Sequence, residues 1–109
     1  IETGMGYGVW LHGEAVAAGM CMAAELSQRL GWITNEDVAR TCALIKKAQL
    51  PVAAPAELDS ERFLDLMSVD KKVKAGKIRL VLLKAIGEAV INDDFDETLL
   101  RETLEACRR

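Results

Sequence analysis

The chain has 109 residues, of which 50% are hydrophobic and 28% charged, and this composition is typical of one small globular domain. Its formal net charge of −3 argues against nucleic acid and anionic membranes as main partners, because both favour a basic protein surface. The longest apolar run, residues 15–24, is far shorter than the ~20 residues that span a bilayer, and no signal peptide is recognisable. We therefore expect a cytoplasmic protein that uses no membrane.

Three cysteines, Cys21, Cys42 and Cys107, lack any CxxC spacing. An odd number at these intervals fits neither a disulfide framework nor a zinc finger. We expect reduced, mostly buried thiols that serve as packing residues. The sequence begins at Ile1 without an initiator methionine, and we expect that it was cut from a longer protein.

The first predicted helix covers residues 13–30, where alanines favour helical structure. Its first half is apolar on nearly all sides, so we expect other elements to enclose that half. Polar residues return near its end, including Glu25 and Ser27, which predicts that the far end lies at the surface. Gly31 is a natural C-terminal stop.

A second helix is expected to begin at Thr34, where Thr34 and Asp37 form a variant of the capping box. One stripe of this helix carries Val38, Cys42 and Ile45, and the Leu50-Pro51 pair should end it.

A third helix should be capped by Asp59 or Ser60. Its predicted buried side carries Phe63, Leu64, Leu66 and Met67. Two short apolar runs, residues 78–83 and 89–91, predict a β-hairpin, and residues 94–108 predict a final helix. The inner side of that last helix should carry Leu99, Leu100, Thr103, Leu104 and Cys107. These patterns predict a mainly α fold with one small β-hairpin, forming one domain over residues 1–109.

His12 is the one histidine of the sequence, and it lies directly before the first predicted helix. Neutral imidazole is a common metal ligand, but a catalytic zinc usually needs three protein ligands. Among nearby residues only Glu14 adds a nitrogen or oxygen ligand, and no His-x-x-x-His arrangement is present. On the residues alone, a structural or surface histidine is the simpler interpretation.

A basic stretch over residues 70–77 places Lys71, Lys72, Lys74 and Lys77 within eight positions. Lysine is a usual phosphate partner, although a solvated helix end explains most lysine runs. Glu2 and Glu14 could act as an acid–base pair, but nothing in the sequence shows that they meet. Arg79 could bind a ligand, but an arginine on a hairpin is commonly solvated.

Two segments together carry a family resemblance: residues 10–20, WLHGEAVAAGM, and residues 70–82, DKKVKAGKIRLVL. With MAAELS at residues 22–27 and AIG at residues 85–87, they closely resemble 3-dehydroquinate synthase. The resemblance covers essentially the whole chain. It implies the helical C-terminal metal- and substrate-binding domain of the dehydroquinate synthase-like fold, without the N-terminal domain that binds NAD.

The resemblance implies a carbon–oxygen lyase of the shikimate pathway, acting on a seven-carbon phosphorylated keto acid with NAD and a divalent metal, zinc or cobalt. It matches His12 to a zinc-ligand histidine that also faces substrate. It matches the Asp-Lys-Lys motif to a lysine that holds an anionic group of the substrate, either Lys71 or Lys72, with a preference for Lys71. No catalytic residue is carried over, and Glu14 is assigned to the first turn of its helix.

The family's remaining metal ligands and its NAD-binding domain lie upstream of Ile1, so this chain alone should be inactive. The expected partners are the substrate, the protein's own N-terminal domain and further copies in a homo-oligomer. Two alternatives stay open: a related sugar-phosphate cyclase, and a non-catalytic helical interaction module. An apolar patch near residues 1–11 should make the isolated chain self-associate.

Overall fold

The structure is a computed structural model, and it describes residues 1, 10–55, 58–68 and 80–107. Within these ranges the elements run α2 (His12–Arg29), α3 (Asn35–Lys47), α4 (Ser60–Ser68), β1 (Leu80–Ala85), β2 (Glu88–Asn92) and α5 (Glu97–Ala106). The two strands form an antiparallel hairpin in which Leu82 pairs with Val90. The predicted mainly α fold with one small hairpin is confirmed.

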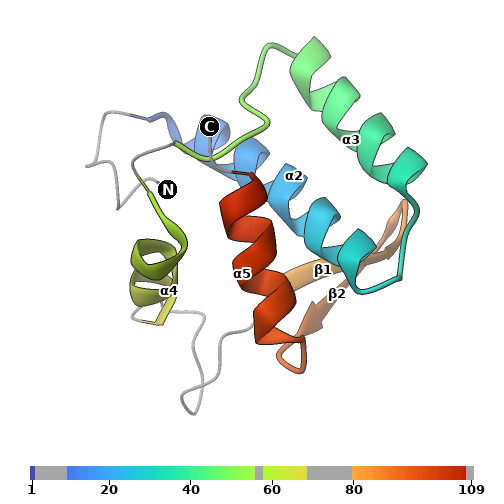
Figure 1. Cartoon of the computed structure of the whole chain (residues 1–109). Coiled ribbons are helices and arrows are strands. Elements are labelled where there is room, and N and C mark those ends of the chain that lie inside the picture. Colours follow the sequence, from blue (N-terminus) through green and yellow to red (C-terminus); the bar gives the residue numbers. More distant parts are fainter. Residues whose placement is uncertain (2–9, 56–57, 69–79, 108–109) are drawn as a thin grey trace.

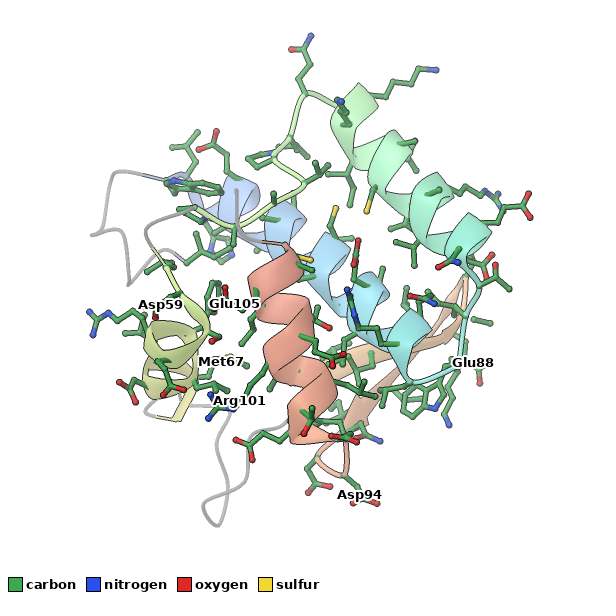
Figure 2. The ribbon with its side chains drawn as sticks, viewed as in Figure 1. Asp59, Met67, Glu88, Asp94, Arg101 and Glu105 are labelled. Carbon is green, nitrogen blue, oxygen red and sulfur yellow. The ribbon has the colours of Figure 1, made fainter. Side chains whose placement is uncertain are left out.

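Helix α2 is the centre of the arrangement, since α3, β1 and α5 all pack against it (Figure 1). Helix α4 packs instead on α5, and Figure 2 shows the facing side chains of these two helices. A hydrogen bond joins these two helices, in which the Ser60 backbone N–H donates to Glu105 Oε1 at 3.0 Å, and Arg101 pairs with Glu61 between them. The main core fills the space between these elements and consists of Met22, Leu26, Ala54, Leu58, Phe63, Leu82, Leu100, Leu104 and Cys107.

The predicted caps are confirmed. Thr34 Oγ1 accepts from the Asp37 N–H at 3.1 Å, and Asp37 Oδ2 accepts from the Thr34 N–H at 3.1 Å, so α3 begins with a reciprocal capping box. At α4, Asp59 Oδ1 accepts from the Arg62 N–H at 2.8 Å, which selects Asp59 rather than Ser60 as the cap. Gly31 follows α2 with φ of +82°, the left-handed conformation that glycine adopts without strain.

The boundaries of two helices differ from the prediction. Helix α3 ends at Lys47 rather than at Leu50-Pro51, because Gln49 takes a left-handed conformation with φ of +63°. Helix α5 begins at Glu97 rather than at residue 94, because Asp96 Oδ1 accepts the Thr98 N–H at 2.8 Å and fixes the start.

The burial predicted along α2 holds only in part. Its first half is enclosed on one side, where Ala17 and Ala18 are buried, but not on the other, where Val16 is 44% exposed and Met20 is 53% exposed. Its far half does not surface at Ser27, which is 0% exposed because the β-hairpin covers it. Ser27 Oγ accepts the N–H of Leu83 on β1 at 2.9 Å and donates to Ala23 O at 2.7 Å. A serine with a partner on another element is thereby satisfied in the interior.

The hairpin is held to the helices at two further points. Leu82 is completely buried in the core. Lys84 Nζ lies 4.0 Å from the ring centroid of Trp32, in the connection that follows α2, which is the geometry of a cation–π contact. Within the described ranges, no helix is long and apolar enough to cross a bilayer.

Candidate functional site

His12 is the first residue of α2, and its side chain is exposed. The local start of the helix is fixed by Glu14, whose Oε1 accepts the Leu11 N–H at 2.9 Å. This contact confirms the expectation that Glu14 belongs to the first turn, where an acidic side chain is favoured by the helix dipole. The imidazole therefore lies at a helix start that a side-chain hydrogen bond defines.

An apolar face accompanies the histidine along α2. Residues His12, Val16 and Met20 are spaced by four, so they share one side of the helix. The neighbouring Leu11 is 70% exposed. Solvent-exposed apolar groups around a potential ligand are typical of a surface that another part of a protein covers. We name Leu11, His12, Val16 and Met20 the α2 face.

The described residues hold no group of three histidine, cysteine, aspartate or glutamate side chains that could bind a metal ion. His12 fits a metal in one respect, as an exposed imidazole at the start of a helix. Three protein ligands are the usual number for a catalytic zinc, so the other ligands would have to come from elsewhere.

Several residues singled out in the sequence lie outside the described ranges. Lys71 and Lys72 are among them, as are Glu2 and Arg79. Their predicted roles stay predictions.

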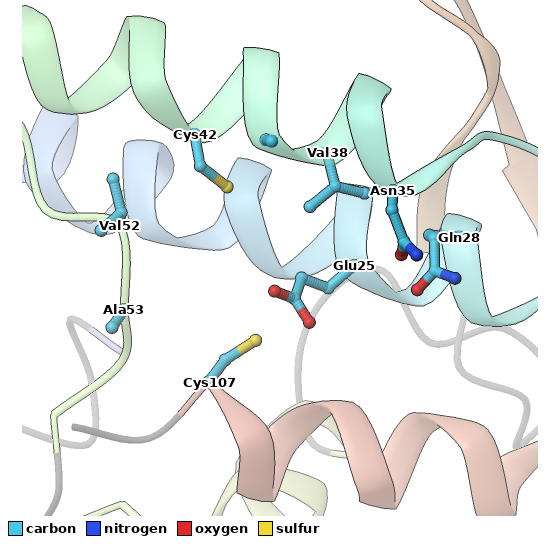
Figure 3. A pocket seen from close by; sticks show the side chains of 9 residues that line it. Glu25, Gln28, Asn35, Val38, Cys42, Val52, Ala53 and Cys107 are labelled. Carbon is cyan, nitrogen blue, oxygen red and sulfur yellow. The ribbon is translucent and has the colours of Figure 1, made fainter.

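A cavity of ≈ 340 Å³ opens between α2, α3, the connector after α3 and the end of α5 (Figure 3). Its lining combines polar groups at one end with thiols and small apolar groups at the other: Glu25, Gln28, Asn35, Val38, Ala39, Cys42, Val52, Ala53 and Cys107. The Glu25 carboxylate is paired with Arg29 Nη1 at 2.8 Å. Sequence reasoning missed this cavity, although the stripe of Val38, Cys42 and Ile45 had placed Cys42 on the inner side of its helix.

Two of the three cysteines, Cys42 and Cys107, line this cavity, and Cys42 also packs against the small cluster that contains Cys21. All three are reduced, with Cys21 and Cys107 buried and Cys42 half-buried, as expected for packing thiols. Burial raises the pKa of the Cys21 thiol to about 12, and a hydrogen bond with Cys42 adds to the rise. Negative charge on Cys42, Cys107 or Glu25 also raises the pKa of Cys21.

Comparison with known proteins gives a consistent result. Residues 1–73 match the family described as 3-dehydroquinate synthase C-terminal. Over 109 residues the chain is 60% identical to a 3-dehydroquinate synthase of Methylococcus capsulatus, covering 100% of this chain and 30% of that protein. It is 57% identical over 109 residues to that of Pseudomonas syringae pv. tomato, again covering 100% and 30%. For an Acinetobacter baumannii 3-dehydroquinate synthase the identity is 58% over 106 residues, covering 97% of this chain and 29% of that protein. The chain therefore spans about 30% of the length of these curated relatives.

Proposed function

The chain belongs to the 3-dehydroquinate synthase family, as its C-terminal region, and we propose that it supplies the metal- and substrate-binding part of such a lyase. The reaction is the conversion of 3-deoxy-D-arabino-heptulosonate 7-phosphate to 3-dehydroquinate and phosphate. The observation that carries the proposal is the exposed position of His12 at the start of α2, inside the segment that matches the family.

His12 is proposed to be one ligand of a divalent metal, zinc or cobalt, whose other ligands belong to the part of the longer protein that this chain does not cover. When bound, such a metal would supply Lewis-acid chemistry at substrate oxygens, and NAD held by the other domain would supply hydride-transfer chemistry. The contribution of this chain is to orient the imidazole. Glu14 fixes the helix start through the Leu11 N–H, and the buried second half of α2 anchors the helix in the core.

The α2 face is proposed to contact the rest of the longer protein. Its exposed apolar side chains surround His12, and a contact there would exclude water from the metal and the substrate. The isolated chain is therefore expected to be inactive and to hold zinc weakly or not at all, because a single imidazole is an incomplete ligand set.

Lys71 or Lys72 is proposed to bind an anionic group of the substrate. An ammonium group that pairs with phosphate or carboxylate contributes about 1.5–3 kcal/mol, so its removal should lower kcat/KM roughly 10- to 100-fold. Lys74, in the same run, is the matched control. Unchanged kcat/KM in both Lys71→Ala and Lys72→Ala would remove this assignment.

A chimera tests the proposal with a complete enzyme. In the 3-dehydroquinate synthase of Methylococcus capsulatus, the segment matched by this chain is replaced by this chain. The chimera should release phosphate in the presence of NAD and a divalent metal, and purified samples should retain metal. Other phosphorylated sugars offered in parallel would reveal a sugar-phosphate cyclase. A folded, metal-loaded chimera that releases no phosphate from the heptulosonate would contradict the proposal.

A further inference from the structure

We propose that Cys42 and Cys21 are an oxidation site: hydrogen peroxide oxidises Cys42 in the cavity, and Cys21 then closes a disulfide that joins α2 to α3. Neither thiol belongs to the metal and substrate site proposed above, so the two proposals stand or fall separately. Two observations support the pair.

The first observation is the packing between the two helices. Cys21 lies in the middle of α2, buried in a small cluster with Ala17 and Ile45, and Cys42 packs against this cluster from α3. Cys21 and Cys42 therefore lie on the facing sides of two packed helices, where a disulfide requires their Cα atoms to lie within about 7 Å of each other.

The second observation is that the two thiols differ in accessibility. Cys42 is half-buried and lines the cavity of ≈ 340 Å³, so a molecule as small as hydrogen peroxide can reach its sulfur. Cys21 is buried and does not line the cavity. Cys42 is therefore the thiol that meets the oxidant first.

The chemistry balances in two steps. The Cys42 sulfur attacks one peroxide oxygen, the O–O bond breaks, and Cys42 becomes a sulfenic acid while one water leaves. The Cys21 sulfur then attacks the Cys42 sulfur, the S–O bond breaks, and the departing hydroxide takes the Cys21 proton as a second water. Two thiols lose two hydrogens in total, and one peroxide is reduced to two waters.

Cys107 is the competing partner, because it lines the same cavity from the end of α5. Figure 3 shows its thiol pointing toward the Glu25 carboxylate, while Cys42 enters the cavity from α3. Cys107 belongs to the main core, whereas Cys42 packs against the separate small cluster that contains Cys21. This packing favours Cys21 as the partner of Cys42.

The test treats both the 109-residue chain and the chimera with hydrogen peroxide, blocks remaining thiols with N-ethylmaleimide and maps the peptides by mass spectrometry. We expect a linked pair of peptides containing Cys21 and Cys42, two hydrogens lighter than the separate peptides and separated by dithiothreitol. The Cys107→Ser variant should keep this link. In the Cys21→Ser variant the reaction should stop at a Cys42 sulfenic acid that dimedone traps.

Three results would overturn the proposal. One is a link that contains Cys107 in place of Cys21. Another is a link only between two molecules, and the last is a Cys42 thiol that stays alkylatable by N-ethylmaleimide after prolonged peroxide treatment. Because the Cys107→Ser variant leaves both proposed partners intact, the result does not depend on whether a change at the buried Cys21 is tolerated.

Discussion

The Ser27 hydroxyl is expected to hold the hairpin to α2, and Ser27→Ala should destabilise the fold by about 1–2 kcal/mol. The Leu83 N–H, now 2.9 Å from Ser27 Oγ, would lose its partner, and an unsatisfied buried donor costs about 1–3 kcal/mol. Alanine is the better helix former by about 0.5 kcal/mol, which offsets a small part of this loss. For a domain of this size the loss corresponds to a decrease in Tm of roughly 5–15 °C.

Urea unfolding followed by circular dichroism measures the change directly, as a lower midpoint at constant m-value. Thr41→Ala is the matched control, since Thr41 Oγ1 also donates to the carbonyl four residues earlier, Asp37 O at 2.9 Å. Within the described residues, no other element forms a hydrogen bond with the Thr41 hydroxyl. Removing this hydroxyl should therefore change stability by less than about 0.5 kcal/mol. Equal midpoints for Ser27→Ala and Thr41→Ala would refute the reasoning that the cross-element bond is what matters.

Three further outcomes follow from the structure. Thr34→Ala removes the acceptor of the α3 capping box and should lower the unfolding free energy by about 1 kcal/mol in urea titrations. An unchanged unfolding free energy would show that this cap does not stabilise the fold. Burial raises the pKa of Cys21 from 9.0 to about 12, so its neutral thiol contributes stability below pH 9 that is lost as the pH rises toward 12. Cys21→Ala should therefore reduce the decline of the unfolding free energy between pH 9 and pH 12. An identical slope in the variant and the wild type would contradict this. The isolated chain should self-associate through the α2 face. Met20→Lys should therefore lower the mass measured by light scattering, whereas Leu44→Lys, at an exposed position of α3, should not. A wild-type chain that stays monomeric at high concentration would contradict self-association.

Local signals in the sequence predicted most of the secondary structure. Thr34 with Asp37, Asp59 and Gly31 act through short-range hydrogen bonds or backbone conformation, so their roles can be inferred from neighbouring residues alone. The starting point of α5 was missed, because Asp94 and Asp96 are equally good caps by residue type and only the geometry selects Asp96.

Burial along α2 could not be predicted, because it depends on which elements pack against the helix. Ser27 looks like a surface residue until a strand more than 50 positions later supplies the Leu83 N–H. Val16 and Met20 look like core residues, yet no described element covers them. For the same reason the clustering of Cys21, Cys42 and Cys107 was invisible in their spacing, since three different elements bring them together.

The role proposed for His12 rests on the family resemblance rather than on physical reasoning about the sequence. A lone histidine is an incomplete metal site, and the described residues add no cluster that would complete it. What the structure adds is its setting, an exposed position at the first residue of a helix whose second half is anchored in the core.

Phosphate release by the chimera, with and without His12, tests the central claim most directly. The chimera should release phosphate from 3-deoxy-D-arabino-heptulosonate 7-phosphate. His12→Ala should lower that rate at least about 100-fold and reduce the bound metal, because a metal ligand is lost. Glu36→Ala, in the first turn of α3, should leave both unchanged. A His12→Ala chimera that retains its metal and releases phosphate at the unmodified rate would contradict the claim that this residue is a ligand of the catalytic metal.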